Sequence, residues 1–180
     1  MEIYLIRHTR PQVEKGLIYG RSDVALASSF STEAAAVLKQ LPEKIDAIYS
    51  SPSSRCTLLA GAIVAASGFT GRSYVTDEAL YELNFGDWEG QTWDTIDRAA
   101  SEAWMKDFVH LSPPNGETML GMEQRISRFW DTLLQESYDK VCIVTHGGVI
   151  RIILARYRAI GLKDSFSIPV AIGEVFRLSV

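Results

Sequence analysis

The 180-residue sequence has few of the residues on which disulfides and metal sites depend. It contains two cysteines, Cys56 and Cys142, which are far apart and belong to no Cys-x-x-Cys pair. A disulfide or a zinc site is therefore not expected, and we predict two buried free thiols. The three histidines, His8, His110 and His146, lack the paired spacing of a metal cluster, so no metal is predicted. His110 is expected to be structural or exposed to solvent.

The motifs of several phosphate-transfer chemistries are also missing. Neither cysteine has an arginine six positions later, as a cysteine-based phosphatase would need. No Asp-x-Asp pair is present for an aspartyl-phosphate enzyme. Two glycines have the spacing of a P-loop, but Met122 stands where the lysine should follow. These absences argue against all three chemistries.

Long hydrophobic runs and an excess of positive charge are absent as well. The only early apolar run is interrupted by Arg7 and His8, so no signal peptide or membrane span is predicted, and a cytoplasmic location is expected. The 18 Lys and Arg against 22 Asp and Glu give a net charge of -4, which argues against nucleic-acid or acidic-membrane partners. The hydrophobic fraction of 47% indicates a globular chain, and its length suits one domain over residues 1–180.

What the sequence does contain is a pattern repeated at three predicted strands. Each short apolar run leads to a cationic or imidazole side chain at, or just beyond, its carboxyl end. The run 3–6 leads to Arg7 and His8, the run 47–49 leads to Arg55, and the run 141–145 leads to His146. Ligands bind at this edge of open α/β sheets, so the pattern predicts a convergent anion site.

Strand and helix patterns alternate along the chain, without repeats or an obvious linker. This alternation predicts a single three-layer α/β/α domain with a mostly parallel central sheet. The expected strands are 3–6, 45–50, 73–76, 141–145 and 174–180, and the expected helices are 31–41, 52–67, 92–107, 122–135 and 149–159.

The second predicted helix places an arginine at an anion-binding position. Ser51 is expected to cap this helix and Pro52 to occupy its first position, while Gly68 ends it. Arg55 then falls in the first turn, where free backbone N–H groups and the helix dipole favour an anion. An arginine placed there for packing alone would oppose the dipole, so we predict that Arg55 binds a ligand.

Four ordered motifs resemble those of the histidine phosphatase superfamily, also called the phosphoglycerate mutase-like family. They are Arg7-His8, then Ser51-Pro52 followed by Arg55, then Glu82 before Phe85-Gly86-Asp87-Trp88-Glu89-Gly90, and finally Thr145-His146-Gly147-Gly148. Within the family, Arg7–Pro11 followed by Tyr19–Val24 is most similar to the alpha-ribazole phosphatase branch, which tolerates Thr9 in place of the usual glycine. The resemblance implies a phosphoglycerate mutase-like fold.

The residue types themselves suit phosphoryl transfer. Arg7 and Arg55 offer planar guanidinium groups for bidentate phosphate contact. His8 is our predicted nucleophile, and the nearby guanidinium groups should keep it neutral. His146 is predicted to donate to a phosphoryl oxygen. The resemblance implies that Glu82 is the proton donor, whereas composition alone would make it an ordinary surface carboxylate.

Further substrate contacts are predicted at Thr9, Gly147 and Arg21. The long segment 10–30 could cover the pocket and bring Arg21, and also Arg10, to a substrate, although a solvated charge on a loop fits each equally well. Glu117 follows a turn-rich connector and is given a structural or pocket-edge role.

The sequence therefore predicts a phosphomonoesterase that acts on a small phosphorylated metabolite through phosphohistidine, with no cofactor. Alpha-ribazole 5'-phosphate, from the assembly of the cobalamin nucleotide loop, is the candidate substrate that the resemblance implies. Two alternatives stay open: a phosphoglycerate mutase-type phosphotransferase and a non-catalytic phospho-ligand binder. The short chain leaves little room for the lid segments that mutases need, and the intact motifs argue against a pure binder.

Overall fold

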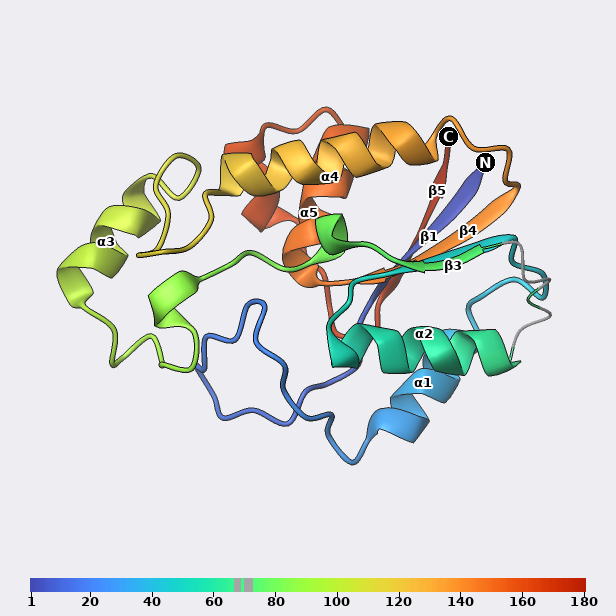
Figure 1. Ribbon diagram of the computed structural model, residues 1–180, viewed down its shortest axis with the longest axis horizontal. Helices are drawn as coiled ribbons and strands as arrows, with labels where there is room; N and C mark the ends of the chain where they lie inside the picture. The colour runs from blue at the N-terminus through green and yellow to red at the C-terminus, as the bar shows by residue number, and fades with distance from the viewer. Residues whose placement is uncertain (67–68, 70–72) are drawn as a thin grey trace.

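The computed structural model describes residues 1–66, 69 and 73–180, and its centre is a five-stranded sheet (Figure 1). The strands are β1 (Glu2–Arg7), β2 (Ala47–Ser50), β3 (Ser73–Thr76), β4 (Lys140–Thr145) and β5 (Val175–Ser179), in the order β3-β2-β4-β1-β5. All pairings are parallel except that of β5, which runs antiparallel to β1. The predicted fold class, with its mostly parallel sheet, is confirmed.

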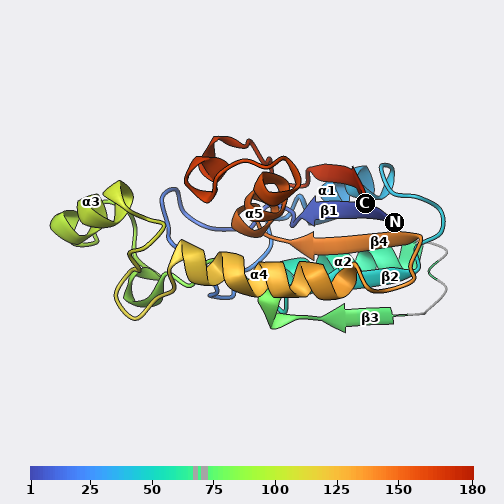
Figure 2. The ribbon, with the colours of Figure 1, turned by 90° about the horizontal axis from the view of Figure 1, so that it is seen from above.

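Helices cover both faces of the sheet because the strand side chains alternate between two apolar layers. Ile3 and Leu5 of β1 join the core layer that contains α4 (Met119–Leu133) and α5 (Gly147–Tyr157). Tyr4 and Ile6 join the other layer, against α1 (Phe30–Leu38) and α2 (Ser54–Ala66). Figure 1 shows the sheet between the two pairs of helices, and Figure 2 shows its strands face-on.

The parallel strands bring the predicted site residues to one edge of the sheet. In the register of β1 and β4, Arg7 lies opposite Thr145, so His8 and His146 follow at the same level. In β2, Ser50 lies opposite Val144, which brings the start of α2 to the same edge. The predicted convergence of the three strand ends is confirmed.

Two helices begin later than the sequence predicts. In α2, the Thr57 N–H donates to the Ser53 carbonyl at 3.0 Å, so Ser51 does not cap the helix; the predicted end at Ser67 and Gly68 lies outside the described residues. The prediction of a helix over 92–107 is wrong for its first six positions. There the Asp97 side chain accepts the Ala100 N–H at 2.7 Å, and this cap starts α3 (Arg98–Lys106).

The remaining elements are short or close to expectation. Thr118 caps α4, and α5 ends before Gly161, at a turn in which Ala159 has a φ of 55°. Three 3₁₀ segments complete the described part of the chain: η1 (Glu78–Leu80), η2 (Gly86–Trp88) and η3 (Leu162–Ser167). Across the described residues, no helix has both the length and the apolar character needed to cross a membrane.

Both cysteines are buried and free, as predicted. Cys56 lies in α2 and Cys142 in β4, and burial raises the pKa of each thiol to about 12. That all 180 residues form one domain stays a prediction.

Candidate active site

A cavity of about 360 Å³ lies at the carboxyl ends of β1 and β4. Its inner wall is polar and its outer wall is apolar. The polar lining includes Arg7, His8, Tyr19, Glu82, His146 and Arg151. Among the described ranges, no group of three or more His, Cys, Asp or Glu side chains could hold a metal ion.

His8 is held as a neutral imidazole with one free nitrogen. Its Nδ1 lies 2.7 Å from the Thr9 carbonyl oxygen, which can only accept, so Nδ1 carries the proton and Nε2 keeps its lone pair. The residue is only 2% exposed, and burial is the main reason that its pKa is lowered to about 3. The charges of Arg55 and Arg7 contribute to this lowering, while the bond to Thr9 acts in the opposite direction. His8 therefore presents an unprotonated Nε2 near neutral pH, as a nucleophile requires.

Arg55 enters the site from the first turn of α2 and is fully buried. Its two terminal nitrogens donate to the carbonyl oxygens of Gly20 at 2.6 Å and Ser22 at 2.9 Å. The ring of Tyr19 lies 5.1 Å from the guanidinium carbon. Because these partners are neutral, they orient the positive charge of Arg55 without cancelling it.

Arg7 is fixed in the same way. Its Nη1 donates to the Val170 carbonyl at 2.7 Å. Neither Arg7 nor Arg55 forms an ion pair with a carboxylate of the described residues. Both Nε atoms, and the Thr9 hydroxyl, are buried donors without a hydrogen-bond partner in that same part of the chain. Buried donors of this kind are costly unless a ligand satisfies them, and oxyanion oxygens are suitable acceptors.

His146 lies beside His8, with 5.3 Å between the ring centroids. Arg55 donates to its Nδ1 at 3.2 Å, so the proton is on Nε2, which lies 2.8 Å from the Ser51 hydroxyl. Burial, and then the charge of Arg55, lower the pKa of His146 well below its ordinary value. In this arrangement His146 orients Arg55. The predicted donor role would need the proton on Nδ1, with the Ser51 hydroxyl donating to Nε2.

Glu82 lies in the segment between η1 and η2, and its carboxylate contacts the start of α5. Its carboxylate accepts the Gly148 N–H and the Leu83 N–H, both at 3.0 Å. A side chain at position 148 would collide with the carboxylate, which explains the glycine there. The carboxylate thus borders the cavity, as a proton donor to a leaving group requires.

The backbone of Glu82 is held from behind by an ion-pair network that we call the clamp, formed by Arg21, Glu117 and Arg125. Arg125 Nη2 and Arg21 Nε donate to the Glu82 carbonyl at 3.2 and 3.4 Å. Both arginines also pair with Glu117, at 2.7 Å for Arg125 and 3.3 Å for Arg21. Burial would raise the pKa of Glu117, but these contacts outweigh it and the pKa is lowered.

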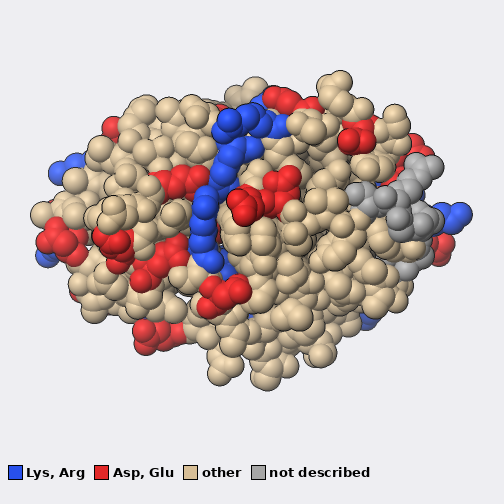
Figure 3. Space-filling model, in the orientation of Figure 1, with Lys and Arg blue, Asp and Glu red and all other residues tan. Residues whose placement is uncertain are grey.

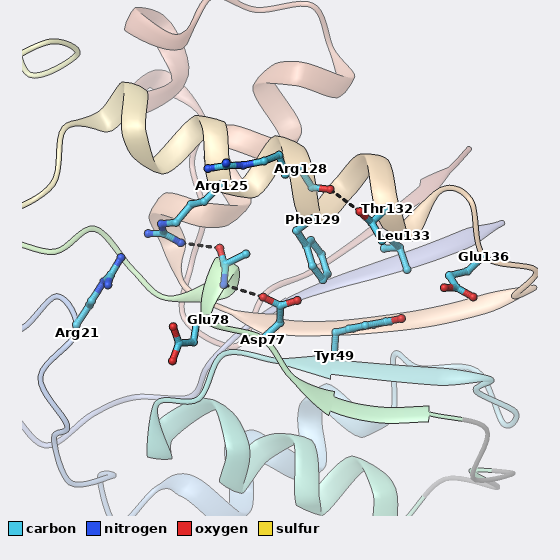
Figure 4. Close-up of a pocket in the computed structure, with 11 residues that line it drawn as sticks. Arg21, Tyr49, Asp77, Glu78, Arg125, Arg128, Phe129, Thr132, Leu133 and Glu136 are labelled. Carbon is cyan, nitrogen blue, oxygen red and sulfur yellow. Dashed lines mark hydrogen bonds between the residues drawn. The ribbon is translucent and has the colours of Figure 1, made fainter.

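Arg21 and Glu117 both take part in the clamp. Arg21 and Arg125 line a separate cavity of about 530 Å³ between α4 and the segment after β3 (Figure 4), and Arg21 is not among the residues that line the His8 pocket. On this face, Figure 3 shows a band of Lys and Arg side chains with Asp and Glu on both sides. Arg10 is also outside the pocket, since it is exposed and pairs with Glu33. The predicted contact of Arg21 with substrate finds no support in this geometry.

The sequence analysis did not assign two residues to the site, Ser51 and Arg151. Ser51 was expected to cap a helix, but its hydroxyl binds His146. Arg151 lines the pocket and donates to the Ile168 carbonyl at 3.0 Å. The signal for Arg151 was present, because it is the one charge in the otherwise apolar run 147–155, one turn after Gly147. A side-chain carbon at position 147 would lie 3.3 Å from both Arg7 and Arg151, so Gly147 allows them to approach.

The model of the histidine phosphatase superfamily (branch 1) matches residues 3–180. The chain belongs to the histidine phosphatase superfamily, and it is a phosphatase enzyme. It is 32% identical to the putative phosphoserine phosphatase 2 of Hydrogenobacter thermophilus, over 92% of this chain and 83% of that protein. The structure of the alpha-ribazole phosphatase from Shigella flexneri superposes with a TM-score of 0.90 at 25% identity, covering 100% of this chain and 91% of the other. The adenosylcobalamin/alpha-ribazole phosphatase of Escherichia coli is 35% identical over 43% of this chain and 40% of its own length.

Proposed function

We propose that this phosphatase hydrolyses a small-molecule phosphomonoester through a phosphohistidine formed on His8. The observation that carries the proposal is the state of His8, which is neutral, with Nε2 free and the guanidinium groups of the buried Arg55 and the half-buried Arg7 close by. A phosphoryl group placed there would find a nucleophile and uncompensated positive charge together.

The reaction proceeds in two balanced steps. In the first, His8 Nε2 attacks phosphorus, the bond from phosphorus to the ester oxygen breaks, and Glu82 gives its proton to the departing alkoxide. In the second, Glu82 takes a proton from water, the hydroxide attacks phosphorus, and the phosphorus–nitrogen bond breaks. Inorganic phosphate leaves, and His8 and Glu82 return to their initial states. Arg7 and Arg55 stabilise the charge on the equatorial oxygens in both steps.

As substrate we propose alpha-ribazole 5'-phosphate. The support is the similarity in sequence and fold to proteins named alpha-ribazole phosphatases. The name of the Hydrogenobacter relative points instead to phosphoserine, so the two esters are the first pair to compare. The cytoplasmic location and the absence of nucleic-acid partners stay predictions.

A chemical trap tests the mechanism. The protein is mixed with a ³²P-labelled phosphomonoester and quenched in base, which preserves phosphohistidine, and the labelled peptide is then identified. We expect the label on His8, and we expect His8→Ala to lose both the label and the turnover. Turnover that persists in His8→Ala, or label on another residue, contradicts the proposal. Transfer of the label to an added alcohol in preference to water would favour the mutase-type alternative.

A further inference from the structure

A second, apolar cavity of about 620 Å³ adjoins the His8 pocket. Phe85, Trp93 and Phe166 line both spaces, so they form the boundary between them, which we call the passage. Beyond the passage lie Trp104 and Phe108, which come from α3 and the segment that follows it. One side of the His8 pocket is therefore bordered by an aromatic chamber. We define this chamber by Phe85, Trp93, Trp104, Phe108 and Phe166.

The chamber walls are aromatic rings that pack against one another. Trp93 and Trp104 stack with 5.9 Å between centroids and 29° between planes. Phe108 and Phe166 meet edge to face at 4.9 Å. Trp93 and Phe166 are nevertheless 42% and 48% exposed. Large aromatic side chains that stay this exposed around a single concavity are typical of binding sites.

One polar atom of the chamber also lacks a partner. Trp104 is 8% exposed, and its indole N–H has no hydrogen-bond partner within the described residues. A buried indole N–H normally finds an acceptor. An acceptor atom on a bound ring would satisfy it.

We infer that the chamber binds the alcohol part of the substrate, and that this part carries a planar aromatic heterocycle. The inference rests on the proposed function, since the phosphate must be held at His8 for the alcohol to extend through the passage. A small zwitterionic alcohol, such as serine, would leave the aromatic walls uncovered and gain nothing from them. The chamber therefore selects against such esters, although the phosphate pocket would accept them.

A series of alkyl phosphates tests the inference without changing the leaving-group chemistry. Ethyl phosphate, 2-naphthylethyl phosphate and the isomeric quinolinylethyl phosphates all release a primary alcohol of similar acidity. We expect kcat/KM to rise about 10- to 100-fold from ethyl to naphthylethyl phosphate, because a ring is buried. We expect a further gain for the quinolinyl isomer whose nitrogen meets Trp104.

Two variants and a control assign the effect. Trp93→Ala should reduce the ratio of naphthylethyl to ethyl turnover about tenfold. Trp104→Phe keeps the ring and removes the N–H, so it should abolish the preference of quinolinyl over naphthyl. Leu134→Ala changes an exposed apolar side chain at the end of α4, which lines neither space, and should leave both ratios as they are.

The outcomes separate this inference from the proposed function. If kcat/KM is the same for all the alkyl phosphates and turnover still depends on His8, the proposed role of the chamber is contradicted and the phosphohistidine mechanism is retained. No turnover of any ester by the folded protein overturns both. A flat series together with a dimer that Trp93→Ala dissociates also overturns the inference, and assigns the aromatic face to contact between copies of the chain.

Discussion

Two groups of arginines lie on opposite sides of Glu82 and differ in what neutralises them. On the pocket side, Arg7 and Arg55 are held by neutral carbonyl oxygens and an imidazole. On the other side, Arg21 and Arg125 share the carboxylate of Glu117. Both groups are well ordered by hydrogen bonds, so the difference is in net charge and not in packing.

This difference decides which group can bind an anion. The single carboxylate of Glu117 offsets half of the positive charge of Arg21 and Arg125, whereas guanidinium groups that are held by carbonyl groups keep their full attraction for phosphate. The clamp uses its hydrogen bonds to fix the backbone of Glu82. The same residue type thus serves as a ligand-binding group at one site and as a positioning group at the other.

The largest expected effect comes from Glu82, which lies between the two groups. Glu82→Gln keeps the shape and removes the transferable proton, so we expect kcat on alkyl phosphates to fall about 10²–10⁴-fold. Loss on p-nitrophenyl phosphate should be much smaller, because its leaving group needs little protonation. Steady-state kinetics on both esters provide the measurement, and equal losses would remove Glu82 from the acid role.

Exchanging arginine for lysine should distinguish the two groups directly. Arg55→Lys retains a charge but loses the planar fork, and we expect kcat/KM to fall about 10²–10³-fold for every phosphomonoester. Arg125→Lys is the matched substitution in the clamp and should cost about tenfold or less. Similar losses in the two variants, in proteins of similar melting temperature, would contradict the contrast drawn between them.

A smaller effect is expected at Glu117, which acts only through other residues. Glu117→Gln weakens both ion pairs and loosens the carbonyl contacts that hold Glu82. We expect kcat on alkyl phosphates to fall about 3- to 10-fold, with KM and p-nitrophenyl phosphate turnover little affected. The alkyl-to-aryl ratio is the informative quantity, since a merely destabilised protein would lose both activities in proportion.

The smallest effect concerns stability as the pH changes. The folded pKa of His8 is about 3, whereas that of an unfolded histidine is 6.5. Below pH 6.5 only the unfolded state takes up this proton, so the stabilising contribution is complete above pH 6.5 and declines as the pH falls towards 3. The slope approaches about 1.4 kcal/mol per pH unit.

Urea unfolding between pH 7 and pH 4 measures this slope. His8→Asn removes the titrating group and should flatten the profile relative to the unmodified protein. His110→Asn is the control, because His110 is exposed and pairs with Asp107 at the surface. An unchanged slope in His8→Asn would show that His8 is not held neutral by burial.

The positions of the strands along the chain and the gathering of Arg7, His8, Arg55 and His146 at one edge of the sheet were predictable because their signals are local. An apolar run that ends at Arg7 and His8 indicates a strand and its polar edge within eight positions. The hydrogen bond that fixes His8 comes from the adjacent residue, Thr9. Parallel strands then bring their carboxyl ends together, so Arg55 and His146 could be placed near His8 without knowledge of side-chain contacts.

The distinction between the two arginine groups was decided only by the tertiary structure. Arg21 and Glu117 are 96 positions apart, and their ion pair depends on how the segment 10–30 packs against the segment before α4. Ser51 and His146 are 95 positions apart, and their hydrogen bond could not be predicted from local sequence. The local pattern predicted a helix cap at Ser51, whereas the fold places its hydroxyl beside the imidazole. Sequence shows that a charge is present, but whether it is neutralised depends on which distant side chains the fold places beside it.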